Sequence, residues 1–168
     1  MQLTRNSLDI NTGPADWFTG TVYIDTIATP VATARTGAAL VHFTPGACTA
    51  WRTHPYGQTI YVTEGIRRCQ CERGPVEEIR PGDRVYFEPG ENNWHDAAPD
   101  RFVTHIAIQE ADQDGSPVAW GQHVTDEQYQ RGPPGRTSVC DNSDPRPGVS
   151  DVFSAWQRRR FARLNALR

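Results

Sequence analysis

The chain has 168 residues, 37% of them hydrophobic, so it can bury one sizeable core but not two. A net charge of −3 argues against a surface built to neutralise the phosphates of nucleic acid, so no nucleic acid partner is expected. All seventeen basic residues are arginine, which excludes Schiff-base chemistry by a lysine side chain.

The N-terminal hexapeptide lacks the apolar segment of a secretion signal, and no run of about 20 apolar residues predicts a membrane span. We therefore expect a cytoplasmic protein without a membrane partner. The cysteines, Cys48, Cys69, Cys71 and Cys140, form neither a CxxC motif nor a zinc-finger pattern. They are expected to stay reduced and to pack as small apolar groups.

Short β-rich runs, separated by Gly and Pro, predict an all-β fold between Ala38 and Glu110. Strands at such regular spacing are typical of a sandwich or barrel rather than a parallel α/β sheet. An upstream run, Gly20–Ile27, alternates in polarity and predicts an edge strand. The other predicted strands are Ala38–Phe43, Thr59–Thr63, Arg67–Cys71, Glu77–Ile79, Arg84–Phe87 and Phe102–Gln109.

Beyond the predicted strands, Thr125 to Gln128 forms a capping-box pattern that predicts the start of a short helix. The last residues predict an amphipathic helix capped by Ser150, whose apolar face would pack on the barrel or on a second subunit, with a membrane-surface helix as the alternative. The predicted organisation is an N-terminal arm with strands (1–37), a barrel core (38–112), a short capping helix (113–130), a Pro/Gly-rich linker (131–149) and a C-terminal helix (150–168).

A first polar cluster lies in the segment 51–58, which leads into a strand. Arg52 and His54 alternate onto the same face of the chain, and Gln58 returns to that face across a bend. We expect these three side chains to converge inside the barrel.

A second polar cluster follows the turns at 81–83 and 89–90, which deliver Asn93 and His95 together. On the strand Phe102–Gln109, the side chains of His105 and Gln109 share one face and can join the cluster if that face points inward. The cavity is then apolar with a small polar group, as small-molecule sites usually are. The residues expected to contact a substrate are Gln58, Asn93, Gln109, Ala39, Val41, Phe43, Ile60 and Tyr86.

The runs PGACTAWRTHPYGQTIYVTEG and IRPGDRVYFEPGENNWHDAAP resemble the two motifs of the cupin family. The segments GPADWFTGTV, VTHIAIQE and VTDEQY resemble, more narrowly, small bacterial cupins related to carboxymuconolactone decarboxylase, some of which are manganese-dependent hydroxynitrile lyases. This resemblance implies a double-stranded β-helix, or jelly-roll barrel, that forms a homodimer or homotetramer. It also implies a metal held by three His and one Gln or Glu. The expected fold is this barrel with a C-terminal helical extension.

Two of the metal-ligand positions implied by the resemblance are changed in this chain. Arg52 stands at the first His position and Asn93 at the His position of the second motif. An arginine has no lone pair to donate and repels a cation. The remaining set, His54, Gln58 and His95, would hold Mn, Fe, Ni or Zn weakly. The sequence therefore favours a protein without a cofactor, with this metal set as the alternative.

Arg52 itself suggests another chemistry, because a fixed positive charge can stabilise a developing oxyanion as a metal would. His54, His95 and His105 then become candidate general acids and bases. Two alternatives stay open. In the first, His105 is a histidine of the core without a catalytic role. In the second, Arg52 forms an ion pair with an acidic residue and the site is inactive.

These features favour a metal-independent cyclase, isomerase or lyase that acts on a small carbonyl-bearing, polyketide-like substrate by acid–base chemistry and oxyanion stabilisation. Biosynthesis in specialised metabolism is the expected setting. One alternative is a metal-dependent lyase, of the hydroxynitrile lyase kind, or a dioxygenase. The other is a module that binds a small molecule without turnover.

Overall fold

The computed structural model describes residues 3, 11–31 and 33–131, which fall within the first of the two compact units of the chain. The predicted linker from residue 132 and the predicted helix 150–168 lie outside the described residues. The described strands are β1 (Asn11–Thr12), β2 (Phe18–Thr19), β3 (Val22–Ala28), β4 (Thr36–Phe43), β5 (Cys48–Thr53), β6 (Gln58–Gly65), β7 (Arg67–Cys71), β8 (Glu77–Ile79), β9 (Arg84–Phe87), β10 (Asn93–Ala97), β11 (Val103–Glu110) and β12 (Ala119–His123), and the helix is α1 (Asp126–Gln130).

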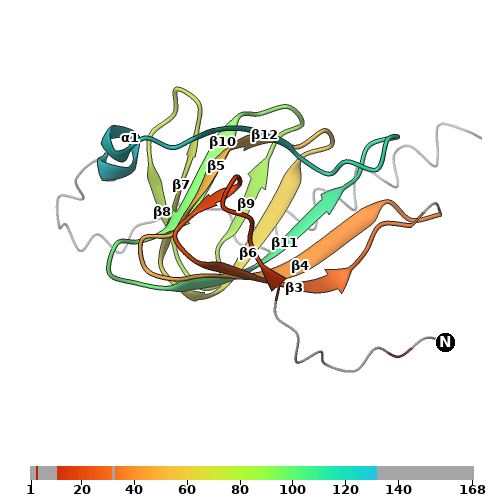
Figure 1. Cartoon of the computed structure of the whole chain (residues 1–168), viewed down its shortest axis with the longest axis horizontal. Coiled ribbons are helices and arrows are strands. Elements are labelled where there is room, and N and C mark those ends of the chain that lie inside the picture. The colour runs from red at the N-terminus through yellow and green to blue at the C-terminus, as the bar shows by residue number, and fades with distance from the viewer. Residues whose placement is uncertain (1–2, 4–10, 32, 132–168) are drawn as a thin grey trace, which may run out of the picture. The chain divides into compact units, whose positions relative to one another are not determined.

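The strands form two antiparallel sheets that face each other (Figure 1). The order in the first sheet is β1, β3, β4, β11, β6 and β9, and the order in the second is β12, β5, β10, β7 and β8, with β2 paired to β5. Neighbours in each sheet include strands far apart in the sequence, such as β4 with β11 and β5 with β12. The prediction of an all-β sandwich or barrel is confirmed.

Alternation of side chains builds much of the core between the two sheets. In β6, Ile60 and Val62 are fully buried, whereas Tyr61 between them is 45% exposed. In β11, Val103 and His105 are buried on the same inner face. The apolar inner residues form one continuous cluster that includes residues of both sheets.

The structure confirms most of the predicted strands, three of them with the predicted bounds: β7, β8 and β9. Strands β1, β2, β10 and β12 are not among the predicted runs, and β5 was predicted only as part of a segment that leads into a strand. Every residue of β10 is buried, including the polar residues Asn93, His95 and Asp96. The strand therefore shows no alternation of apolar and polar residues. Hydrophobic periodicity cannot identify such a strand, because it identifies buried positions by their apolar side chains.

The predicted capping box is confirmed at the start of α1. The backbone N–H of Gln128 donates to Thr125 Oγ1 at 3.2 Å, and the backbone N–H of Thr125 donates to Gln128 Oε1 at 2.9 Å. The helix is shorter than the predicted segment 113–130, since residues 119–123 form strand β12. No helix in the part of the chain that the structure describes has the length and hydropathy of a membrane span.

Replacing Thr125 by alanine is expected to lower the free energy of unfolding by about 1 kcal/mol, because the cap of α1 is lost. Thr125→Ser keeps the hydroxyl and is the matched control, expected to unfold as the wild type does. Denaturant unfolding of the three proteins measures the difference. Equal stability of the alanine and serine variants would show that the cap contributes nothing.

The charged residues near α1 form a buried pair on the outer side of the second sheet. Arg68 of β7 and Asp96 of β10 make an ion pair in which the carboxylate side chain is fully buried and the guanidinium side chain is 8% exposed. The ring of Tyr129 lies over the guanidinium at 4.3 Å, and Arg68 Nη1 donates to the carbonyl of Tyr129 at 3.0 Å. This pair fastens α1 to the sheet.

Candidate active site

A cavity of about 130 Å³ lies between the two sheets. Its lining combines apolar side chains with polar ones, and the polar ones include the predicted Arg and His residues. Its described lining consists of Phe18, Ile24, Ala39, Val41, Phe43, Thr49, Arg52, His54, Gln58, His95, His105, Ala107, Gln109, Val118 and Trp120.

The turn between β5 and β6 brings the first polar cluster together. Gly57 has a φ of 80°, and a Cβ there would lie 2.6 Å from the carbonyl oxygen of Phe87. Only glycine suits this position, because it combines a left-handed conformation with a close backbone neighbour. The turn reverses the chain after His54 and returns Gln58 to the cavity, as the sequence predicted.

Arg52 is held in the cavity wall by hydrogen bonds rather than by an acid. Its Nη1 donates to Thr49 Oγ1 at 2.6 Å, and its Nη2 donates to Gln58 Oε1 at 3.1 Å. Gln58 Nε2 in turn donates to Gln109 Oε1 at 3.0 Å. Among the described residues, no carboxylate forms an ion pair with Arg52. The guanidinium is therefore fixed in direction, and its charge is not neutralised by the protein around it.

A bulge in β5 explains how Thr49 reaches Arg52. Between the pairs Asn93–Arg52 and Asp96–Cys48, strand β5 has one residue more than β10. The extra residue shifts the alternation, so that Thr49 faces the cavity while Cys48 packs in the cluster outside it.

His54 presents a free nitrogen at the cavity. Its Nδ1 lies 2.8 Å from the carbonyl oxygen of Pro117, which can only accept, so Nδ1 carries the hydrogen and Nε2 keeps its lone pair. Nε2 is buried and has no partner among the described residues. Burial, followed by the positive charge of Arg52, lowers the pKa of His54 to about 4. The imidazole is therefore neutral at neutral pH.

His95 and His105 lie side by side on facing sheets. Their ring centroids are 5.1 Å apart at an interplanar angle of 79°, and each packs on the ring of Phe43. Nδ1 of each is buried without a partner in the described part of the chain. Burial and the charges of Arg67 and Arg52 hold the pKa of His105 well below its usual value. The three predicted histidines thus meet at one cavity.

The depressed pKa of His54 predicts how stability depends on pH. A histidine titrates at about 6.5 in the unfolded chain and His54 at about 4 in the folded one, so the unfolded chain binds more protons between these values. We expect the free energy of unfolding to be highest above pH 6.5 and to fall by about 3 kcal/mol towards pH 4 from this group. Denaturant unfolding across this range measures the fall. The non-titrating variant His54→Asn should fall less steeply, and an equal slope would contradict the assignment.

Three residues predicted to contact a substrate do not line the cavity. Tyr86 is 50% exposed, because its neighbours Val85 and Phe87 point inward and alternation turns it outward. Ile60 is fully buried in the core. Asn93 is fully buried, and its Nδ2 donates to the backbone carbonyls of Arg52 at 3.2 Å and Glu91 at 3.0 Å. Its amide therefore supports the backbone of β5.

Part of the cavity wall comes from distant segments of the chain and was not predicted from the sequence. Phe18 comes from β2, Ile24 from β3 and Trp120 from β12, and pairing of β2 and β12 with β5 brings two of them to the cavity. The ring of Trp120 stacks on that of Trp17 at 5.2 Å and packs edge-on against Phe18 at 5.6 Å. In the sequence, the aromatic residues of the segment GPADWF were the signal that could have indicated this part of the wall.

The donor set does not fit a tightly held divalent metal. Arg52 occupies one ligand position implied by the family resemblance, and it donates to Gln58 Oε1, the oxygen a metal would need. Asn93 is engaged with the backbone. Among the described residues, no group of three or more His, Cys, Asp and Glu side chains is arranged to hold a metal ion. His54 and His95 alone would bind a divalent ion weakly.

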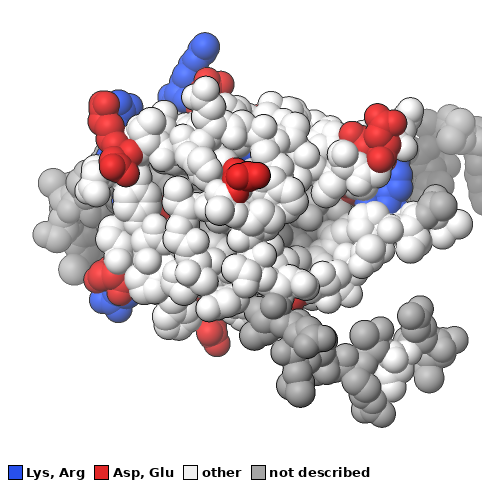
Figure 2. Space-filling view, viewed as in Figure 1, with Lys and Arg blue, Asp and Glu red and all other residues white. Residues whose placement is uncertain are grey.

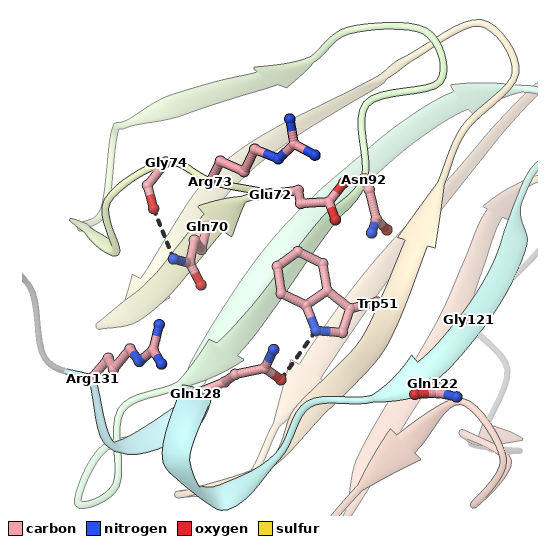
Figure 3. Close-up of a pocket in the computed structure, with 10 residues that line it drawn as sticks. All are labelled: Trp51, Gln70, Glu72, Arg73, Gly74, Asn92, Gly121, Gln122, Gln128 and Arg131. Atoms are coloured by element: carbon pink, nitrogen blue, oxygen red, sulfur yellow. Dashed lines mark hydrogen bonds between the residues drawn. The ribbon is translucent and has the colours of Figure 1, made fainter.

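Two other pockets lie outside the barrel interior. One, of about 580 Å³, lies over the outer face of the second sheet, where Gln128 accepts a hydrogen bond from Trp51 (Figure 3). The other, of about 470 Å³, shares His54 and Val118 with the cavity between the sheets. We assign the chemistry to the interior cavity, because it alone among these three combines Arg52 with the three histidines.

Comparison with known proteins places this fold and cavity in a family. A family model described as a cupin domain matches residues 39–100. The (R)-mandelonitrile lyase of Granulicella tundricola is 58% identical over 119 residues, which cover 71% of this chain and 90% of that protein. The chain belongs to the cupin family.

Solved structures agree with this assignment. A cupin-like protein from Thermotoga maritima is 33% identical, with a TM-score of 0.70, and the match covers 79% of this chain and 100% of that one. A polyketide cyclase from Streptomyces resistomycificus has a TM-score of 0.58 at 16% identity, covering 77% of this chain and 91% of that one. The second likeness concerns the fold alone.

Proposed function

We propose that this cupin-fold enzyme is a metal-independent lyase, which cleaves a carbon–carbon bond in a small α-hydroxy nitrile or a similar carbonyl precursor. The single observation that carries the proposal is a buried, unneutralised Arg52 in a cavity with three histidines, of which His54 and His105 have lowered pKa values. The high identity to a mandelonitrile lyase favours a lyase over a cyclase or an isomerase.

The reaction needs a proton acceptor and a positive charge in the same small space. A base removes the hydroxyl proton of the substrate, and the O–H electron pair becomes the second bond of the carbonyl group. The carbon–carbon bond to the nitrile breaks, and its electron pair leaves on cyanide. The base then returns the proton, so that an aldehyde and hydrogen cyanide are released.

The described residues supply both groups. His54 Nε2 is unprotonated and unpartnered, and it accepts the hydroxyl proton, while the Nδ1 bond to Pro117 fixes its direction. Arg52, which is buried, stabilises the negative charge that develops on the departing group. His95 and His105, which lie on the two facing sheets, offer two more imidazoles at the same cavity.

The size of the cavity limits the substrate. About 130 Å³ is smaller than the 300–1,000 Å³ typical of sites for drug-sized ligands. The apolar lining residues, such as Phe18, Ile24 and Trp120, suit the apolar part of the substrate, and the polar lining residues suit the hydroxyl and leaving group. A small aromatic or aliphatic cyanohydrin meets both demands.

Product release from mandelonitrile tests this function. The full chain, dialysed against a chelator, is incubated with racemic mandelonitrile, and benzaldehyde is followed by its absorbance while the remaining enantiomers are separated. We expect faster release than in buffer, with one enantiomer consumed first. Binding of the nitrile without any release above the buffer rate would overturn the proposal and favour a non-catalytic module. Activity that returns only with added Mn, Fe, Ni or Zn would favour the metal-dependent alternative.

The expectations about the setting of the protein stay proposals: a homodimer or homotetramer in the cytoplasm, without nucleic acid or membrane partners, that acts on a small molecule. The view in Figure 2 agrees with a mixed surface, since acidic and arginine side chains are scattered over it and no basic patch gathers on this face.

A further inference from the structure

The interior between the sheets holds an imbalance of charge. Arg52 is 3% exposed and Arg67 is fully buried. Among the described residues, the buried acidic side chain is Asp96, and it is paired with Arg68 on the outer side of β10. The charge of Asp96 also acts on Arg67, but one buried carboxylate cannot balance the three buried guanidinium groups of Arg52, Arg67 and Arg68. Buried charges are normally paired, because an unpaired one loses its hydration without compensation.

Arg67 shows this imbalance in atomic detail. Its Nε, Nη1 and Nη2 are all buried, and none has a hydrogen-bond partner in the described part of the chain. Its guanidinium lies 5.8 Å from the ring centroid of Phe43, a cation–π contact that compensates only part of the charge. Phe43 in turn lines the cavity. The charge of Arg67 thus lies directly behind the cavity wall.

Arg52 faces the cavity from the other side of this wall. Two of its five N–H groups are used by Thr49 and Gln58. Burial and then the charge of Arg67 lower the pKa of Arg52 to about 9, so both groups remain cationic at neutral pH and repel each other. A negative charge in the cavity would interact favourably with both arginines.

We propose that the cavity binds a small monovalent anion at Arg52, with Arg67 supplying a second positive charge from behind Phe43. The volume of about 130 Å³ limits the anion to a small one. Two sources share this chemistry: a linear leaving group such as cyanide, and the carboxylate of a small organic acid. The inference rests on the proposed function in taking this cavity as the reaction site, but it concerns binding, which is measured without turnover.

The test uses sodium azide as a linear anion, sodium acetate as a carboxylate and acetamide as the neutral counterpart of acetate. Calorimetric titration and the unfolding temperature of the full chain are measured at constant ionic strength. We expect azide or acetate to bind and to raise the unfolding temperature, while acetamide does neither. Stronger binding of azide identifies the linear leaving group, and stronger binding of acetate identifies a carboxylate. Absence of binding by both anions, or equal binding of acetamide, would overturn the proposal.

The variant Arg67→Met separates the role of the buried charge from that of packing. Without anion, this variant is expected to unfold at a higher temperature than the wild type, because an unpaired buried charge is removed. Its affinity for the better-bound anion should fall about tenfold or more. Arg84→Met, at an exposed position of β9, is the matched control and should change neither quantity. A lower unfolding temperature or an unchanged affinity in Arg67→Met would contradict the proposal.

Failure of this inference can be told from failure of the proposed function. Anion binding that depends on Arg67, without release of benzaldehyde from mandelonitrile, supports the anion site and removes the lyase. Release of benzaldehyde by a protein that binds neither anion supports the lyase and removes the anion site.

Discussion

Replacing Arg52 by glutamine is expected to lower kcat for cleavage of mandelonitrile by about 10²–10³-fold, the usual effect of removing a group that stabilises developing negative charge. Arg52 is the one Arg, Asp or Glu side chain among the described residues that line the cavity. Glutamine is uncharged, yet it can still donate a hydrogen bond towards Thr49. Steady-state kinetics measure the loss, which we expect mainly in kcat because the charge acts on the leaving group as the bond breaks.

Two controls accompany this variant. Arg52→Lys keeps the charge but lacks the planar guanidinium group that donates to Thr49 and Gln58 together. Its kcat should therefore lie between those of the wild type and Arg52→Gln. Arg84→Gln, at an exposed position of β9, should leave kcat unchanged. Unfolding curves show whether each variant is folded at the assay temperature. A folded Arg52→Gln protein with wild-type kcat would remove Arg52 from the reaction.

The second large effect concerns stability. Replacing Asp96 by asparagine is expected to lower the free energy of unfolding by about 3–5 kcal/mol, since the guanidinium of Arg68 stays buried without its counter-charge. The carboxylate accepts from the backbone N–H of Arg68 at 2.9 Å and from its Nε at 3.0 and 3.3 Å. An amide keeps the shape but not the charge. Denaturant unfolding at neutral pH measures the loss.

A double-mutant cycle separates the ion pair from packing. Arg68→Met removes the cation, so the combination of Arg68→Met with Asp96→Asn should cost less than the sum of the two single changes. If the single costs add up, the two residues do not interact in the folded protein. A loss below about 1 kcal/mol in Asp96→Asn would place the pair with ordinary surface ion pairs.

Much of the fold could be predicted, because turns and alternation were both visible in the sequence. Gly and Pro marked the ends of β7, β8 and β9, and apolar residues alternated in β6 and β11. Strand β10 carried no such signal, since Asn93 and His95 face the interior. A strand whose inner face is polar looks like a loop to pattern analysis.

The polar side of the cavity was predictable for the same physical reason. Residues at even spacing along a strand share a face. The even spacing of Arg52 and His54, and of His105 and Gln109, placed these four side chains on inner faces. The same alternation contradicts the prediction that Tyr86 contacts a substrate, because a residue between two inward-pointing neighbours points outward.

Long-range pairing explains what could not be predicted. Phe18 and Trp120 reach the cavity because β2 and β12 pair with β5, and nothing local to either segment indicates that pairing. The same holds for Arg67. Its strand was predicted with the right bounds, but its burial without a partner depends on the surrounding strands.

Metal content and activity, measured on the same sample, test the central claim that Arg52 replaces a metal. The purified full chain is dialysed against a chelator, its Mn, Fe, Ni and Zn are measured by mass spectrometry, and mandelonitrile cleavage is assayed before and after dialysis. We predict far less than one metal ion per chain and the same kcat in both samples. Stoichiometric metal, with activity lost on dialysis and restored by adding the ion, would contradict the account.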